Sequence, residues 1–209
     1  MLRTMMPALF FAALLTGACH EHGPAIEGEA DCCAAEAPAA VGLDALPGTS
    51  LYLLDEPFTD QANAAFELSG LRGGPVVAAM IFTNCSYACP RILVDLKLIE
   101  DSLTEAQRSD VTFLLISMDT NRDTPEVLAA YATEKQLDTN RWTLLHGSDF
   151  AVRGVAAALG VRYKRDVNGD FAHSNLITVL DESGRIAHQL EGLNADTSGT
   201  TAALVELLP

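Results

Sequence analysis

The chain has 209 residues and a formal net charge of −15, and 49% of its residues are hydrophobic. This length and composition fit one folded domain with a sizeable core plus an extension. A surface this acidic repels the phosphates of nucleic acids, so nucleic-acid binding is excluded, whereas metal ions and cationic partners are compatible with it.

The first 18 residues have the pattern of an export signal. Arg3 precedes an apolar run at 8–15, and small residues follow that run directly before Cys19. Small residues before a cysteine resemble a bacterial lipoprotein processing site, although Leu15 stands one position further from the cysteine than that pattern prefers. We expect residues 1–18 to be removed and Cys19 to carry a lipid anchor in the bacterial periplasm. The alternative is an uncleaved membrane anchor.

The segment 19–45 is rich in Ala, Glu and Pro and cannot bury a core, so it is expected to form a flexible tether. Four metal-ligating side chains lie within it: His20, His22, Cys32 and Cys33. One interpretation is a metal-capturing arm built from these side chains. The other is incidental thiols or a disulfide between molecules, because adjacent cysteines pair with each other only under strain. The folded domain is expected over residues 46–209.

The domain is expected to alternate short strands and helices. Strands are predicted at 51–54, 65–68, 76–82, 111–117, 142–145, 175–180 and 185–190. Helices are predicted at 90–103, from 125 onward, at 150–159 and at 200–208. Pro90 is expected at the first position of its helix, Thr124 and Asp149 as helix caps, and Gly160 as a helix end. With a polar loop at 164–170, this order predicts an α/β thioredoxin-like fold, a central mixed sheet flanked by helices.

Two cysteines, Cys85 and Cys89, lie between the predicted buried strand 76–82 and the helix expected from Pro90. At the start of a helix both sulfurs meet the positive end of the helix dipole, which favours thiolate over thiol. Such a pair is a metal-ligand set or a redox pair. A structural disulfide is the third interpretation. Against it, the short closed loop would restrict the unfolded chain little, and open α/β sheets bind ligands at βα turns.

Three motifs in order resemble the Sco/SenC family. They are Thr83-Asn84-Cys85-Ser86-Tyr87-Ala88-Cys89-Pro90, then Ser117 to Glu126 with its Asp-Thr-Pro helix start, then Phe171-Ala172-His173-Ser174, followed by Asp181 to Arg185. Members of this family are membrane-tethered thioredoxin-fold proteins that bind copper and help assemble the binuclear copper centre of cytochrome c oxidase. The resemblance covers residues 51–208. It departs at Ser86 and Thr120, where the family usually has Pro.

The resemblance places copper ligands on Cys85, Cys89 and His173. Two soft thiolates and an imidazole suit copper, with Cu(I) satisfied by the thiolates and Cu(II) gaining from the nitrogen. The implied function is a metallochaperone, more a carrier than an enzyme, that passes copper to a subunit of cytochrome c oxidase or to a related copper enzyme. Another periplasmic copper chaperone is a further expected partner. The alternative is a thiol–disulfide reductase that keeps the client's cysteines reduced, with Cys85 as the attacking thiolate and Cys89 as the second catalytic thiol.

Other residues and functions have weaker support. A peroxidase of the peroxiredoxin type shares the fold, but its attacking cysteine usually follows a Pro-containing loop, and Thr83-Asn84-Cys85 lacks that Pro. His146 and His188 are interpreted as structural or exposed, and Met118 as a core residue. Asp119 follows a buried strand, where a carboxylate either orients a neighbouring functional group or caps a turn. Both interpretations of Asp119 are open.

Overall fold

The computed structural model describes residues 50–167 and 170–209. All of them fall within one compact unit, Val41–Pro209. The predicted signal, the predicted tether and the side chains singled out in them lie outside the described residues. Those side chains are Cys19, His20, His22, Cys32 and Cys33.

A seven-stranded mixed sheet forms the centre of this unit, with the strand order β2-β1-β5-β4-β3-β8-β9. Its strands are β1 (Phe58–Asp60), β2 (Ala65–Phe66), β3 (Val76–Ile81), β4 (Thr112–Ser117), β5 (Trp142–Gly147), β8 (Leu176–Leu180) and β9 (Ile186–Glu191). The central strands β3, β4 and β5 are parallel, whereas β1 and β8 join them antiparallel. Every residue of β3 is buried, as predicted for a strand covered on both faces.

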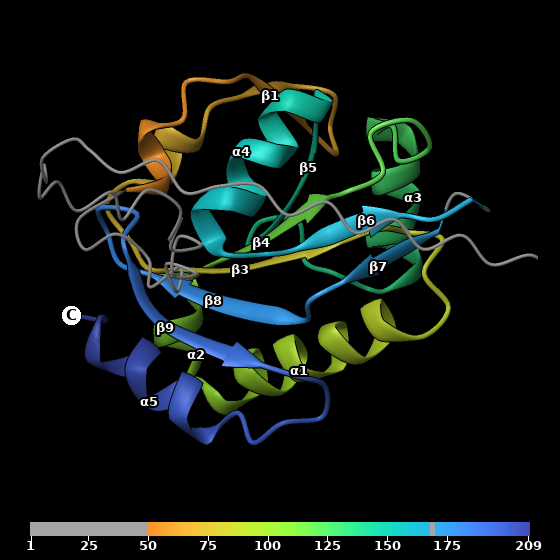
Figure 1. Cartoon of the computed structure of the whole chain (residues 1–209). Coiled ribbons are helices and arrows are strands. Elements are labelled where there is room, and N and C mark those ends of the chain that lie inside the picture. The colour runs from red at the N-terminus through yellow and green to blue at the C-terminus, as the bar shows by residue number, and fades with distance from the viewer. Residues whose placement is uncertain (1–49, 168–169) are drawn as a thin grey trace, which may run out of the picture. The chain divides into compact units, whose positions relative to one another are not determined.

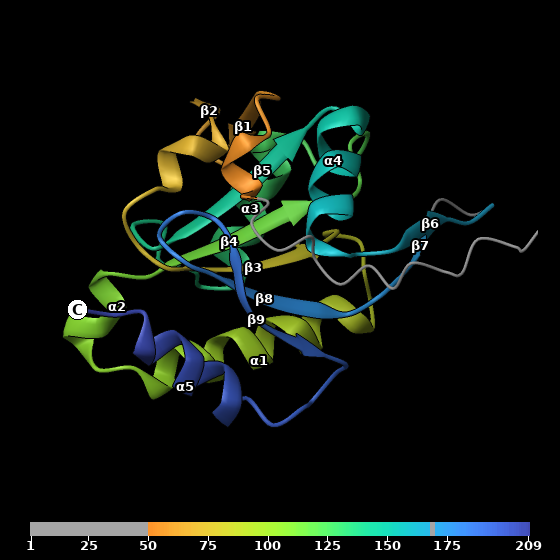
Figure 2. The same cartoon turned by 60° about the vertical axis from the view of Figure 1, so that its left-hand side comes forward.

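Helices cover both faces of the sheet. They are α1 (Ala88–Ser102), α2 (Glu105–Ser109), α3 (Pro125–Glu134), α4 (Asp149–Leu159) and α5 (Ser198–Glu206). Helices α1 and α5 pack together on one side, and α4 lies on the other side (Figures 1 and 2). This arrangement confirms the predicted thioredoxin-like α/β fold. In the part of the chain that the structure describes, none of the helices combines the length and apolar character needed to cross a bilayer.

The first turn of α1 differs by two residues from the prediction, whereas that of α3 agrees with it. Thr124 caps α3 and Pro125 is its first residue. Helix α1 begins at Ala88, so Pro90 is its third residue rather than its first. The amide at the third position also lacks an intrahelical acceptor, so proline is tolerated there for the same reason. As a result Cys89 lies inside the first turn of the helix instead of before it.

The start of the described domain is a helical turn and not the strand predicted at 51–54. A 3₁₀ helix spans Leu51–Leu53, and the Ser50 hydroxyl accepts a hydrogen bond from the Tyr52 amide at 3.1 Å. This local side-chain bond starts a turn at the position where the apolar residues alone suggested a strand. The strand that pairs with β2 is β1, across a turn in which the Asn63 amide donates to the Asp60 carbonyl oxygen at 3.0 Å.

Two helix termini show which local signals were read incorrectly or missed. Ser148, not Asp149, caps α4, because the serine hydroxyl accepts a hydrogen bond from the amide three residues further on. Gly160 closes this helix in the left-handed region, at φ 71°, as predicted. The short helix α2 was not predicted, although Thr104 and Gln107 form a reciprocal capping box at its start.

A second, two-stranded sheet flanks the polar loop predicted at 164–170 and takes in the first two residues of that loop. It is an antiparallel hairpin of β6 (Tyr163–Arg165) and β7 (Phe171–His173), with Tyr163 opposite His173. The hairpin lies near the carboxyl end of β3 and the start of α1 (Figure 1). Among the described residues no strand pairing links it to the central sheet. Its position is therefore set by side-chain contacts and by its short connection to β8 through Ser174 and Asn175.

Candidate metal centre

The two cysteines are positioned by the turn between β3 and α1. Cys85 precedes the helix, and its sulfur accepts a hydrogen bond from the Cys89 amide at 3.2 Å. Cys89 lies in the first helical turn, and its sulfur accepts from the Phe82 amide at 3.5 Å. The amide groups at the start of a helix lack intrahelical partners, so they are available to a sulfur placed over the helix start.

The two thiols have opposite electrostatic environments. Partial burial acts to raise the pKa of Cys85, but hydrogen bonds from the amides of Cys89, Tyr87 and Ala88 together hold that pKa below its ordinary value. Burial raises the pKa of Cys89, because its side chain is only 1% exposed. The prediction that the helix start favours both thiolates therefore agrees with the environment of Cys85 and is wrong for the metal-free Cys89.

His173 reaches the cysteine pair from the end of β7. Its Nε2 lies 4.0 Å from the Cys89 sulfur, and its Nδ1 lies 3.0 Å from the Ser174 carbonyl oxygen. A carbonyl only accepts, so Nδ1 carries the proton and Nε2 of the neutral ring has a free lone pair on the side of the cysteines. The ring also meets Phe82 edge-on, with centroids 6.1 Å apart.

Cys85, Cys89 and His173 offer one ligand atom each, and these atoms all lie within 4.8 Å of one another. The part of the chain that the structure describes contains no other group of three such side chains. Two sulfurs and one nitrogen, with the second ring nitrogen fixed by a carbonyl, form a donor set that fits a soft transition metal. The structure thus brings together all three residues that the sequence singled out.

A cavity of about 360 Å³ gives access to this group from solvent. It borders Cys85 and His173 and is walled by Tyr87 and Phe171. Cys85 is partly exposed, whereas Cys89 lies behind it in the core. An incoming group therefore reaches the first cysteine and the histidine before it reaches the second cysteine.

Asp119 holds the hairpin that carries His173. Its side chain is fully buried, pairs with Arg122 and accepts a hydrogen bond from Arg165 Nη2 of β6 at 2.5 Å. The Arg165 guanidinium also lies over the Phe171 ring, 5.1 Å from its centroid. Asp119 thus orients a neighbouring element and also accepts a bond within its own turn, from the Arg122 amide at 3.3 Å. Both of its predicted roles are present.

The loop before Cys85 is fastened by Asp123, which the sequence interpretation used only as part of a motif. Its carboxylate accepts hydrogen bonds from the Thr83 amide at 2.9 Å and from the hydroxyls of Thr83 and Ser117, both at 2.5 Å. These bonds join the loops that follow β3 and β4. The signal that could have identified this role is a carboxylate directly before the Thr-Pro helix start.

The remaining candidate residues lie outside the cluster. His146 Nδ1 donates to the Asp123 carbonyl oxygen at 2.9 Å, which makes it a structural residue. His188 is half-buried on β9, and Met118 is buried in the core. Sequence reasoning missed Arg165, because it stands in the segment 164–170 that was predicted to be a loop, and it used Phe171 only as part of a motif.

Comparisons with known proteins identify the family. Residues 52–208 match the family described as SCO1/SenC. The chain is 25% identical to the SCO1 protein homolog of Bacillus subtilis (strain 168) over 146 residues, an alignment that covers 66% of this chain and 74% of that protein.

Solved structures of this family have the same fold. A SCO1/SenC family lipoprotein from Bacillus anthracis is structurally similar, with a TM-score of 0.66 and 25% identity over 72% of this chain and 91% of that one. Bradyrhizobium japonicum ScoI with copper bound has the same fold, with a TM-score of 0.62 and 24% identity over 73% of this chain and 97% of that one. Since the family match spans most of the sequence and includes all three clustered residues, the chain belongs to the SCO1/SenC family.

Proposed function

We propose that this protein binds copper through Cys85, Cys89 and His173 and delivers it to a subunit of cytochrome c oxidase or to a related copper enzyme. The observation that carries the proposal is the convergence of two sulfurs and an imidazole nitrogen within 4.8 Å. Soft thiolates favour copper, and the imidazole adds a donor that suits Cu(II). A structural relative has been solved with copper bound, and another, BsSco, is described as a member of the Sco family of cytochrome c oxidase assembly proteins.

The geometry suits transfer by ligand exchange. Cys85 and His173 border the cavity, so ligands of an accepting protein would displace these two donors first. Cys89, which is only 1% exposed, would be the last donor to dissociate from the copper. Each metal–ligand bond that breaks in such a transfer is replaced by one from the accepting protein, and no substrate is converted, so the chain would act as a carrier rather than an enzyme.

Copper stoichiometry and absorption spectra of the reduced protein test this proposal in the unmodified chain and in His173→Ala. We expect one copper per chain and thiolate-to-Cu(II) charge-transfer bands that His173→Ala abolishes, with Cu(II) affinity lowered by about 100-fold or more. His188→Ala is the matched control, because it removes a histidine outside the cluster and should leave the spectra unchanged. Identical spectra for the two variants would refute the three-ligand site.

Thiol–disulfide reduction is a second candidate, favoured by the asymmetry of the cysteine pair. Cys85 is accessible and has a lowered pKa, as an attacking thiolate requires, while Cys89 is buried behind it as a resolving thiol would be. The variant His173→Ala separates the two functions, since disulfide exchange needs only the thiols. If His173→Ala loses copper binding but retains disulfide exchange, the histidine serves copper binding alone. A chain that holds no copper but cycles a Cys85–Cys89 disulfide is a reductase.

The site of action follows from the predicted N-terminal segment. We propose an exported protein anchored to a bacterial membrane by a lipid on Cys19, with the copper-binding domain in the periplasm. The sequence pattern at 1–19 supports this, and the similar Bacillus anthracis protein is described as a lipoprotein. The same location suits a copper-accepting oxidase subunit or a second periplasmic copper chaperone as the partner. The thiols and histidines of the segment 19–45 are proposed as an additional copper-capturing arm.

A further inference from the structure

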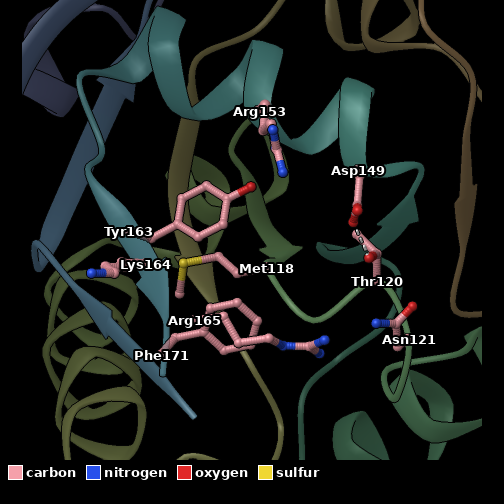
Figure 3. Close-up of a pocket in the computed structure, with 9 residues that line it drawn as sticks. All are labelled: Met118, Thr120, Asn121, Asp149, Arg153, Tyr163, Lys164, Arg165 and Phe171. Carbon is pink, nitrogen blue, oxygen red and sulfur yellow. Dashed lines mark hydrogen bonds between the residues drawn. The ribbon is translucent and has the colours of Figure 1, made fainter. Parts of the chain in front are cut away.

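A second cavity, of about 460 Å³, lies beside the β6–β7 hairpin and is separate from the metal centre (Figure 3). Its walls come from the loop after β4, from the first turns of α4, and from both strands of the hairpin. Phe171 borders this cavity and also the smaller one next to Cys85. A volume of this size falls within the range of about 300–1,000 Å³ that is usual for small-molecule sites.

One wall of the cavity is apolar. It consists of the side chain of Met118 and the rings of Tyr163 and Phe171, which lie side by side in Figure 3. The two rings are in contact, with centroids 6.0 Å apart. A flat apolar group placed against this wall would cover the exposed parts of the two half-buried rings, whereas Met118 is already enclosed by the core.

The polar wall is dominated by positive charge. The Arg153 guanidinium enters from α4 toward the Tyr163 hydroxyl, and the Arg165 guanidinium extends from β6 below the rings (Figure 3). The acid in this wall, Asp149, already accepts a hydrogen bond from the Thr120 hydroxyl. A concentration of cations in one hollow is unusual in a chain with a net charge of −15, because such a chain otherwise repels anions.

Of the two guanidiniums, Arg153 is the one available to a ligand. Arg165 is held by the buried Asp119 through Nη2 and lies over Phe171, so its place in the wall is fixed. Arg153 is exposed, and its guanidinium descends from α4 to the Tyr163 hydroxyl, to which it donates one hydrogen bond while its other N–H groups remain for a ligand (Figure 3). A guanidinium has parallel N–H donors that match the two oxygens of a carboxylate.

We propose that this cavity binds a small organic carboxylate, with its carboxylate on Arg153 and its apolar part against Met118, Tyr163 and Phe171. Cationic and apolar side chains line the same cavity, so a ligand needs both characters to satisfy them. Inorganic phosphate would meet the cation but leave the apolar wall uncovered. A neutral aromatic alcohol would cover that wall but leave the guanidinium without a counter-charge. The site is independent of the copper proposal, since it uses none of the three clustered residues.

Nuclear magnetic resonance titration of the full metal-free chain with benzoate tests this site. Benzyl alcohol and inorganic phosphate serve as the neutral and the purely ionic probes. We expect saturable benzoate-induced shifts confined to the amides of 118–121, 149–153 and 163–165 and of Phe171. Arg153→Gln should weaken benzoate binding by about tenfold or more, because it removes a charge-assisted pair of hydrogen bonds. Arg185→Gln removes the same charge from an exposed turn elsewhere and should bind benzoate as the unmodified chain does.

Four results would overturn the proposal: no saturable shifts with benzoate, equal affinity in Arg153→Gln and the unmodified chain, benzyl alcohol binding as tightly as benzoate, or phosphate binding more tightly than benzoate. Because the experiment uses metal-free protein, its outcome is distinct from that of the copper measurements. A chain that fails to hold copper can still bind benzoate here, and the reverse also holds.

Discussion

Cys85 and Cys89 are four positions apart, yet their side chains differ in exposure to solvent and in hydrogen bonding. The first is partly exposed and collects amide donors at the start of α1, whereas the second is enclosed by the core. The Cys85 thiol is therefore accessible for reaction or ligand exchange, whereas the Cys89 thiol is shielded from solvent. This division of roles suits a metal carrier and also suits a redox pair.

We expect iodoacetamide to modify Cys85 well before Cys89 in reduced, metal-free protein. The pKa of Cys85 lies below the ordinary value of 9.0, so its reaction rate should rise and level off at lower pH than that of an unperturbed cysteine. Cys89 should react slowly while the protein is folded, because it is buried and protonated. Mass spectrometry of the modified peptides across a pH series measures both rates.

Cys85→Ser is the control for this measurement, since it should remove the rapid phase completely. Equal rates for the two cysteines in the folded protein would contradict the environments described here. The sequence predicted the position of both sulfurs at a helix start, and for Cys85 this was sufficient. It could not predict the raised pKa of Cys89, because the burial that causes it comes from strands and loops distant in the chain.

The β6–β7 hairpin is the element on which the metal centre depends most and which the sequence revealed least. Its strands have three residues each, and the segment 164–170 is too polar to give the alternation of apolar residues by which strands are recognised. The hairpin is held by Phe171 against Phe82, at 5.1 Å between ring centroids, and by the bond from Arg165 to Asp119. Contacts of this kind have no local sequence signature.

Arg165→Gln should move His173 away from the cysteines without unfolding the domain. The buried Asp119 would keep Arg122 as its partner, while the hairpin would lose its ionic link to the end of β4. We expect Cu(II) affinity to fall by about tenfold and the charge-transfer bands to weaken, with Cu(I) binding by the thiolates nearly unchanged. Parallel titrations with the two oxidation states measure this difference.

Arg141→Gln is the matched control for the hairpin variant. It removes an arginine paired with Glu100 at 3.2 Å and with Asp138 at 3.2 Å, on elements remote from the centre. A similar loss of Cu(II) affinity in both variants would show a general loss of stability. An unchanged affinity in Arg165→Gln would show that ring contacts alone position the histidine.

Elements with strong periodic patterns were predicted more accurately than the short ones. The buried strand β3, the helix α1 that follows it, and the pair β8 and β9 all lie where the apolar residues indicated. The segment 51–54 was predicted wrongly, because its apolar residues serve a helical turn that a serine hydroxyl starts. Side-chain hydrogen bonds of this kind determine the secondary structure of short segments, whereas hydrophobic periodicity determines that of long ones.

At the scale of the whole domain, its first turn closes against its last hairpin. The Leu51 amide donates to the Gly184 carbonyl oxygen at 2.8 Å, and the Tyr52 ring packs against that glycine. A Cβ at position 184 would lie 2.6 Å from the ring, and φ there is +80°, so the turn between β8 and β9 requires glycine. The Tyr52 hydroxyl is buried and has no hydrogen-bond partner among the described residues.

Tyr52→Phe should change stability mainly at alkaline pH. Burial raises the pKa of Tyr52 from 10.0 to about 12, so the folded state keeps the phenol protonated after the unfolded chain has lost the proton. Below pH 10 the phenol is protonated in both states, and as the pH rises from 10 to about 12 its ionisation in the unfolded chain alone lowers the free energy of unfolding, by on the order of 2 kcal/mol. The variant lacks this loss. At pH 7 it should be equally stable or more stable by about 1 kcal/mol, because the buried hydroxyl lacks a partner.

Urea denaturation followed by fluorescence measures this effect, with the buried Trp142 as the reporter and the only tryptophan of the chain. The difference in unfolding free energy between the variant and the unmodified chain should grow between pH 10 and 12. A difference that stays constant across this range would refute the burial of the phenol. Tyr163→Phe, at a half-buried position in the hairpin, is the comparison for a less enclosed phenol.

The division of the metal ligands between two sheets has a mechanical consequence. Cys85 and Cys89 belong to the unit built on the central sheet, and His173 belongs to a hairpin that no strand pairing joins to it among the described residues. A displacement of the hairpin would therefore remove the nitrogen donor and leave the two sulfurs in place. Since Cu(II) gains from the nitrogen and Cu(I) is satisfied by sulfur, such a displacement would weaken Cu(II) binding more than Cu(I) binding.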